Sequence, residues 1–384
     1  MSSSCVLFAV FAMTMANATV FATVGLFGRS IGLSEFQVGT IFVSSAVLFL
    51  LTSPRWGVLA DRWGRRPVIV VGLAATGTSL FLFAGIAHAA RDLAGVLAAF
   101  VTLLGARAVY GLLAGGTQPA AIAVMADVTT AGRRSAGVAR VGAAIGLGSI
   151  AGPLSVAALI DLGVAAPLVA GAVVSSLAAV VVFAGGRERR HASAADTRPI
   201  GRASARLVPF LVLAFAMHFA FAALQPTNAF YIQDRLGIDT AQAMRLAGLV
   251  SAVFAASSFV IQVFVVLPIG LPPSRLLAVG LALCLVGLVA CLLAPTYGVL
   301  LAGFGLLGIG FGFAQPGLLA GASLAAGDRQ AEVAGTLQAA MAAAWIAGAL
   351  AGTGVYSLSI VGPLALAAFA ILGALLLTLL SHRE

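Results

Sequence analysis

The chain has 384 residues, of which 61% are hydrophobic and only 9% are charged. Soluble domains average about 25% charged residues, so this composition excludes an ordinary soluble globular protein. The net charge of +9 comes from arginine, because the sequence has no lysine. These arginines lie in short clusters between apolar stretches, which is the pattern of membrane topology and not of nucleic-acid binding.

Twelve apolar stretches follow one another, each long enough to cross a bilayer as a helix. Hydrocarbon cannot satisfy loose backbone amides, so each stretch is expected to be helical. We therefore predict an all-α membrane protein of twelve transmembrane helices, arranged as two pseudo-symmetric six-helix bundles. The predicted spans are 5–28, 37–60, 67–87, 95–126, 136–160, 164–185, 207–232, 244–267, 275–294, 298–324, 331–357 and 361–380.

The arginines also indicate how the chain crosses the bilayer. With a cytoplasmic N-terminus, fifteen arginines fall in the cytoplasmic connectors and four in the external ones. Positive charge in short connectors favours the cytoplasmic side, so we expect both termini to lie in the cytoplasm. The expected location of the protein is the cell (inner or plasma) membrane. The polar segment 187–206 is expected to be a flexible cytoplasmic linker between an N-terminal bundle, 1–186, and a C-terminal bundle, 207–384.

The two halves resemble each other weakly. Residues 116–119 (GTQP) precede Asp127 as residues 313–316 (FAQP) precede Asp328, and a glycine-rich span follows in each half. Such a repeat of six spans is typical of secondary transporters, whose binding site lies between the repeats.

The connector between the second and third spans carries the most specific pattern, GVLADRWGRRP at residues 57–67. Two helices are expected to end here, joined by a tight turn at Gly64. Asp61 lies among three arginines, close enough for charge-assisted hydrogen bonds that latch neighbouring helices. A plain positively charged loop would explain the arginines but not the spacing of glycine and aspartate. The candidate latch residues are Gly57, Asp61, Arg62, Gly64, Arg65 and Arg66.

This segment resembles the G-x-L-[AS]-D-R-x-G-R-[RK]-P signature of the major facilitator superfamily and matches all of it. The resemblance implies the major facilitator fold and an inner-face latch that Asp127 joins. Residues 107–111 are similar to the family's intramembrane arginine motif. Residues 142–153 resemble the glycine–proline motif of twelve-span tetracycline and multidrug exporters, although Ala157 and Ala158 replace its usual closing glycines. A helix bend is expected at Gly148, Gly152 and Pro153, and close helix packing is the alternative explanation of these glycines.

Arg107 is the most informative single residue. It lies twenty residues before Asp127, so a continuous helix places it about 30 Å from the inner end. A charge there costs at least about 2.5–3.5 kcal/mol, so it normally faces a cavity or a partner. Tyr110 and Gln118 follow at helical spacing and are expected to form an inward-facing polar stripe. A structural arginine bound to backbone carbonyls is the alternative.

Two observations bear on coupling. No aspartate or glutamate lies in mid-span, and Asn17 stands where many proton-coupled cation exporters of the resembled family carry a carboxylate. Span seven carries the other candidates, His218, Gln225 and Asn228, and the first two share a face of a continuous helix. Histidine titrates near neutral pH, so His218 could carry a coupling proton, whereas a hydrogen-bonded structural histidine is the alternative.

Together these features predict a secondary active transporter that expels a small organic compound by proton-coupled alternating access. Two alternatives remain open. One is an exporter of an anionic metabolite or siderophore, which is favoured by a span that carries an arginine and no acidic residue. The other is a symporter that takes up a metabolite. Neither a GxxxxGK[ST] motif nor an HExxH cluster or nucleophile–base pair is present, so we expect no direct use of ATP and no enzyme activity. The expected partners are a small-molecule substrate, protons and the lipid bilayer, without nucleic acid, metal or cofactor, and the chain is expected to act as a monomer.

Overall fold

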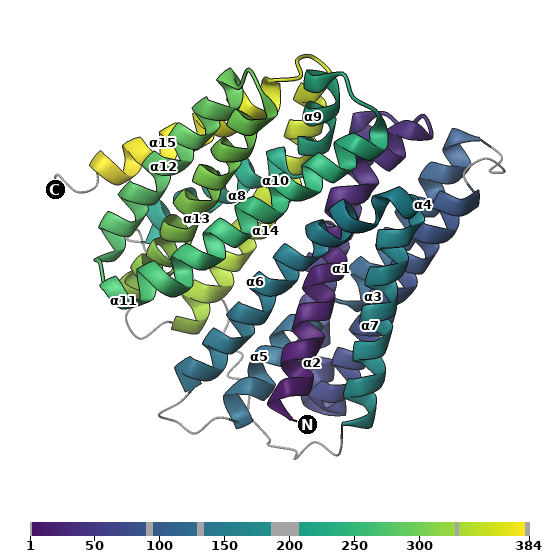
Figure 1. Cartoon of the computed structure of the whole chain (residues 1–384). Coiled ribbons are helices and arrows are strands. Elements are labelled where there is room, and N and C mark those ends of the chain that lie inside the picture. The colour runs from purple at the N-terminus through teal and green to yellow at the C-terminus, as the bar shows by residue number, and fades with distance from the viewer. Residues whose placement is uncertain (1, 90–94, 129–133, 186–206, 327–329, 381–384) are drawn as a thin grey trace. The chain divides into compact units, whose positions relative to one another are not determined.

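The computed structural model describes residues 2–89, 95–128, 134–185, 207–326 and 330–380, and every regular element in these ranges is a helix (Figure 1). Eleven of these helices are long and apolar enough to cross a membrane, and counting a bent pair as one span raises the number to twelve. The predicted all-α membrane fold is therefore confirmed. The expected linker, 187–206, lies outside the described residues.

The chain divides into two compact units. Unit 1 comprises Met1–Ala195 and Asp239–Gly248, and unit 2 comprises Asp196–Ile238 and Leu249–Glu384. The first turns of α10 (Thr240–Val260) thus belong to unit 1. Hydropathy could not predict this assignment, because it locates a span without indicating which helices the span packs against.

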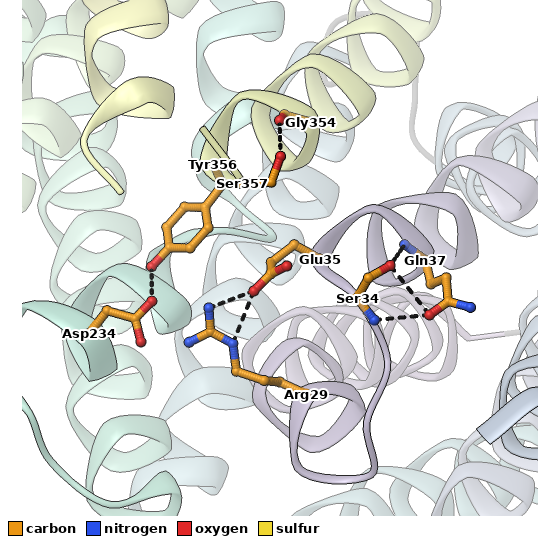
Figure 2. Close-up of polar contacts among 8 residues, drawn as sticks. All are labelled: Arg29, Ser34, Glu35, Gln37, Asp234, Gly354, Tyr356 and Ser357. Carbon is orange, nitrogen blue, oxygen red and sulfur yellow. Dashed lines mark hydrogen bonds and ion pairs between the residues drawn. The ribbon is translucent and has the colours of Figure 1, made fainter. Parts of the chain in front are cut away.

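Unit 1 is a helical bundle in which α1 packs against α6 and α7, and α4 packs against α2 and α3. Ser34 caps the start of α2, where its Oγ accepts from the Gln37 amide at 3.2 Å and its own amide donates to Gln37 Oε1 at 2.9 Å (Figure 2). At the other end of α2, Gly64 turns the chain directly into α3 with a φ of 96°, a value that favours glycine. The elements of unit 1 are α1 (Ser3–Ser30), α2 (Glu35–Trp63), α3 (Arg65–Ala89), α4 (Val96–Leu113), α5 (Thr117–Val128), α6 (Arg134–Leu159), η2 (Ile160–Leu162) and α7 (Ala165–Ala184).

The fourth predicted span is found as one membrane-length stretch, Val96–Met125, but its helix is interrupted between α4 and α5. Helix α4 ends at Leu113 and α5 begins at Thr117, because Gly115 and Gly116 stand at the junction and glycine weakens a helix. A break inside a membrane is tolerated when the freed carbonyls find donors, and side chains of α2 supply them here. The hydrogen bonds run from Thr52 to Gly111 (3.2 Å), from Ser53 to Gly115 (3.3 Å) and from Trp56 Nε1 to Leu112 (2.7 Å).

In unit 2, α12 packs against α13 and α15, and α8 packs against α14 and α15. The seventh predicted span, 207–232, is also broken: α8 and α9 meet at an angle of 45°. Pro226 explains the break, because proline lacks an amide hydrogen and its ring clashes with the carbonyl of the preceding turn, so α8 cannot continue through it. The elements are α8 (Val208–Leu224), α9 (Asn228–Leu236), the rest of α10, a π-helical η4 (Ile261–Val266), α11 (Leu267–Ile269), α12 (Pro273–Leu293), α13 (Tyr297–Ala326), α14 (Gln330–Tyr356) and α15 (Gly362–Leu380).

Glycines let two helix pairs approach closely, one pair in each unit. In unit 1, a Cβ on Gly152 of α6 would lie 2.5 Å from the Met15 carbonyl oxygen of α1. In unit 2, a Cβ on Gly348 of α14 would lie 2.5 Å from the Phe219 carbonyl oxygen of α8. The glycine-rich spans that suggested an internal repeat therefore make corresponding contacts in the two units. Helix α6 runs through Pro153 without an interruption, so a bend there stays a prediction.

Candidate substrate and coupling site

Arg107 is a buried cation in the middle of α4, with a side chain that is only 2% exposed. Its Nη2 donates to Asn17 Oδ1 of α1 at 2.7 Å. Tyr110, three residues further along α4, places its ring 4.4 Å from the guanidinium carbon. The structure therefore brings together three of the candidate residues of the N-terminal half, from two helices of unit 1.

Two phenylalanine rings complete the surroundings of the guanidinium. Its carbon lies 5.7 Å from the ring centre of Phe21 in α1 and 5.8 Å from that of Phe42 in α2. These two rings stack on each other with centres 4.6 Å apart. Aromatic faces attract a cation, so the rings offset part of the cost of removing Arg107 from water. We call Arg107, Asn17, Phe21, Phe42 and Tyr110 the arginine cluster.

The sequence contained a signal for only one of these phenylalanines. Phe21 follows Asn17 by four residues, so the two share one face of α1. Phe42 carried no such signal, because its approach to Arg107 depends on how α2 packs against α4.

The hydrogen bonding of Arg107 is incomplete. Its Nε and Nη1 are buried and have no hydrogen-bond partner in the described part of the chain. The ion pairs between described side chains are Arg29–Glu35, at 2.6 Å, and Arg245–Asp161. Arg107 takes part in neither, so it is a buried charge without a described counter-ion, which is costly inside a membrane protein.

Gln118 lies apart from this cluster. The break between α4 and α5 interrupts the polar stripe that the sequence suggested, and the Gln118 side chain is exposed whereas Tyr110 is buried. The helical spacing from Arg107 to Gln118 therefore does not translate into a shared face.

The candidate latch lies around the Gly64 turn. Asp61 is exposed, and no ion pair between described side chains includes it. Arg66 contacts α7: its Nε donates to the Val182 carbonyl at 3.0 Å, and its guanidinium lies over the Phe183 ring. The side chain of Asp127 lies outside those that the structure describes, so the latch stays a prediction. A Cβ on Gly57 would meet nothing within 4 Å, and Arg62 is exposed.

His218 is the candidate coupling residue of unit 2, on α8, and is 8% exposed. Its Nδ1 lies 2.9 Å from the Ala214 carbonyl oxygen. Because a carbonyl only accepts, this bond requires a hydrogen on Nδ1 and leaves Nε2 as the atom that can gain or lose a proton. The ring meets Phe311 of α13 edge-on, with ring centres 6.1 Å apart.

An aromatic cluster that the sequence did not reveal adjoins His218. Phe221, one turn along α8, contacts Phe311, Phe254 of α10 and Trp345 of α14, with ring centres 5.1 to 5.6 Å apart. Because these rings come from four helices of unit 2, no local pattern could have grouped them.

Gln225 and Asn228 do not share a helix face with His218. Gln225 lies beyond the last residue of α8, at the bend before α9. Asn228 begins α9, is 8% exposed and donates from Nδ2 to Ser251 Oγ at 3.4 Å, while its Oδ1 has no partner among the described atoms. The bend at Pro226 therefore separates residues that a continuous helix would have aligned. No group of three or more possible metal ligands occurs in the described ranges.

Comparisons with known proteins extend this description. The sequence profile of the Major Facilitator Superfamily matches residues 6–349. Multidrug resistance protein 2 of Bacillus subtilis is 27% identical over 253 residues, which cover 61% of this chain and 59% of that protein. Tetracycline resistance protein class G of Vibrio anguillarum is 29% identical over 261 residues, which cover 64% and 61%. The matches thus span about three fifths of the length of these relatives.

Solved structures show the same fold at low sequence identity. A bacterial homologue of the human lysosomal transporter Spinster has a TM-score of 0.74 at 14% identity, covering 99% of this chain and 96% of that one. The human organic anion transporter MFSD10 has a TM-score of 0.68 at 19% identity, covering 98% of both chains. With a profile match over most of its length and a fold of membrane-spanning helices, the chain belongs to the Major Facilitator Superfamily and is a multi-pass membrane protein.

Proposed function

We propose that this transporter expels a small organic compound from the cell in exchange for protons, by alternating access between its two halves. The relatives named for multidrug and tetracycline resistance support efflux, as does the glycine–proline motif of α6. We also propose that the protein is a monomer in the cell membrane, with both termini in the cytoplasm. The distribution of arginines supports this orientation, and membership of the family supports the monomer and the membrane.

The observation that carries the proposal is the buried Arg107, hydrogen-bonded to Asn17 across α1 and α4. A structural contact between these helices would not need a charge, since apolar residues of similar size pack at no electrostatic cost. Charged groups inside membrane bundles mark substrate and ion pathways, and an arginine whose surroundings change during transport can bind cargo or set the protonation of a neighbour.

His218 is the proposed proton carrier. Its Nε2 can take up and release a proton, and two groups in contact with the ring, the Ala214 carbonyl and the Phe311 ring, are uncharged. An imidazole in such a setting is free to change charge as its exposure to water changes, which is what coupling requires.

Transport by purified protein in proteoliposomes tests this function. Labelled tetracycline or norfloxacin is added outside vesicles whose interior is made acidic, and we expect accumulation that collapses when the pH gradient is dissipated. His218→Ala should bind the drug but no longer respond to the gradient, whereas the control His88→Ala, which alters an exposed histidine of α3, should behave as wild type. Drug movement independent of the gradient in the wild type would refute proton coupling, and full gradient-driven transport by His218→Ala would move the proton pathway to another residue.

A further inference from the structure

We propose that Arg107 is the binding site for a carboxylate on the transported molecule, so that the cargo class is organic anions with a flat apolar body. This inference rests on the proposed transport function and adds the chemistry of the substrate. It follows from three features of the arginine cluster: its free donors, its uncompensated charge and its aromatic walls.

The guanidinium of Arg107 keeps a complete two-donor edge available. Nη2 carries two hydrogens, one on the edge shared with Nε and one on the edge shared with Nη1. Asn17 accepts one of them, and Nε and Nη1 have no partner among the described atoms. Whichever hydrogen Asn17 takes, the other edge still offers two parallel N–H donors. That is the geometry with which arginine binds a carboxylate by two hydrogen bonds.

No described carboxylate compensates the charge of Arg107. The side chains that contact it from α1, α2 and α4 are an amide, two phenyl rings and a phenol: Asn17, Phe21, Phe42 and Tyr110. Glu35 and Asp161, the carboxylates in described ion pairs, are bound to Arg29 and Arg245. A ligand carboxylate would neutralise the buried cation, whereas a cationic ligand would add like charge in a poorly hydrated place.

The walls of the cluster favour a flat apolar body beside the carboxylate. Phe21 and Phe42 stack with an angle of 11° between their planes, so they present parallel faces next to the guanidinium. Phe21 is the less buried of the two. A planar ring attached to the carboxylate could therefore pack beside Phe21 when the helices part during transport.

The competing explanation is that Arg107 only ties α4 to α1. The two explanations differ in what Asn17→Asp does, because aspartate has nearly the shape of asparagine and would place a carboxylate within hydrogen-bond distance of Arg107. An internal carboxylate would occupy the guanidinium and remove its preference for an anionic ligand. If Arg107 were purely structural, the same substitution would tighten the contact and leave ligand preference unchanged.

Binding of two matched probes to the full chain in lipid nanodiscs tests the proposal. The probes are 2-naphthoate and 2-naphthamide, which share one ring system and differ in charge, and isothermal titration gives a Kd for each. We expect wild type to bind 2-naphthoate at least about tenfold more tightly, as one charge-assisted hydrogen bond suffices for this ratio. In Asn17→Asp and in Arg107→Gln the ratio should fall to about one, because 2-naphthoate loses a charge-assisted interaction and 2-naphthamide loses at most a neutral hydrogen bond.

Arg29→Gln is the control, because it removes an arginine that is already paired, with Glu35, and it should keep the wild-type ratio. If Arg107→Gln fails to fold, the wild-type ratio and Asn17→Asp still decide the matter. A wild type without preference for 2-naphthoate, or an Asn17→Asp variant that keeps the full preference, would overturn the proposal. If wild type transports tetracycline along the pH gradient but shows no preference for 2-naphthoate, this inference alone is refuted. If wild type prefers 2-naphthoate but shows no gradient-driven transport, only the proposed function is refuted.

Discussion

Replacing Gly348 by alanine tests the close packing of α14 against α8 in unit 2. The new Cβ would lie 2.5 Å from the Phe219 carbonyl oxygen and 2.9 Å from Ala222 Cβ. Ordinary contact begins at 3.4 Å, so the helices must separate by about 0.9 Å or the backbone must shift. Overpacking of this kind costs about 1–3 kcal/mol, and we expect Gly348→Ala to lower the stability of unit 2 by that amount.

Gly354 provides a matched control on the same helix. A Cβ there would meet nothing within 4 Å, so Gly354→Ala should be neutral or stabilising by up to about 1 kcal/mol, because alanine favours the helix over glycine. The protein contains its own reporters, since Cys284 and Cys291 on α12 are 2% and 0% exposed. In a background in which the partly exposed Cys5 of α1 is replaced by serine, a thiol-reactive fluorophore will therefore follow unfolding of unit 2 on heating. Equal melting temperatures for the two variants, or a Gly348→Ala protein as stable as wild type, would refute the packing argument.

Three further predictions follow from other contacts. Gly152→Ala should destabilise unit 1 by about 1–3 kcal/mol, whereas Gly142→Ala on the same helix, which meets nothing within 4 Å, should not; intrinsic tryptophan fluorescence on heating measures both. Tyr356→Phe should lower stability by about 1–2 kcal/mol in the same thiol assay, because it removes the 2.6 Å hydrogen bond to Asp234 Oδ2 (Figure 2), and an unchanged melting temperature would count against that bond. Asp61→Asn should abolish transport while leaving membrane insertion intact, and near-normal transport by correctly inserted protein would end the latch assignment.

Hydropathy predicted the spans well because burial in hydrocarbon leaves a signal in every stretch of the chain. It did not predict the interruption of the helix at Gly115–Gly116 or the bend at Pro226. These residues were visible in the sequence, but each lies within an apolar stretch long enough for a single span. At the first interruption, side chains of α2 donate hydrogen bonds to the carbonyls that the helix leaves free. These donors lie on another helix, so no local sequence pattern could reveal them.

The candidate site was predictable in part. Arg107 and His218 stood out because a charged or titratable group in an apolar segment is costly wherever the segment packs. Their partners were harder to predict, since Asn17 lies 90 residues from Arg107 and Phe311, which contacts His218, lies on another helix of an aromatic cluster built from four helices. Residues that were linked by helical spacing, such as Tyr110 with Gln118, were separated wherever the helix broke between them.

Proteoliposome transport under an imposed pH gradient, with wild type compared with Arg107→Lys and Arg107→Ala, tests the central claim most directly. Labelled 2-naphthoate and tetracycline serve as cargo. We expect wild type to move cargo against the proton flow. We expect Arg107→Ala to stop transport and Arg107→Lys to retain a small part of it, because lysine keeps the charge but loses the planar fork. Gradient-driven transport by Arg107→Ala at the wild-type rate would show that Arg107 has no role in transport.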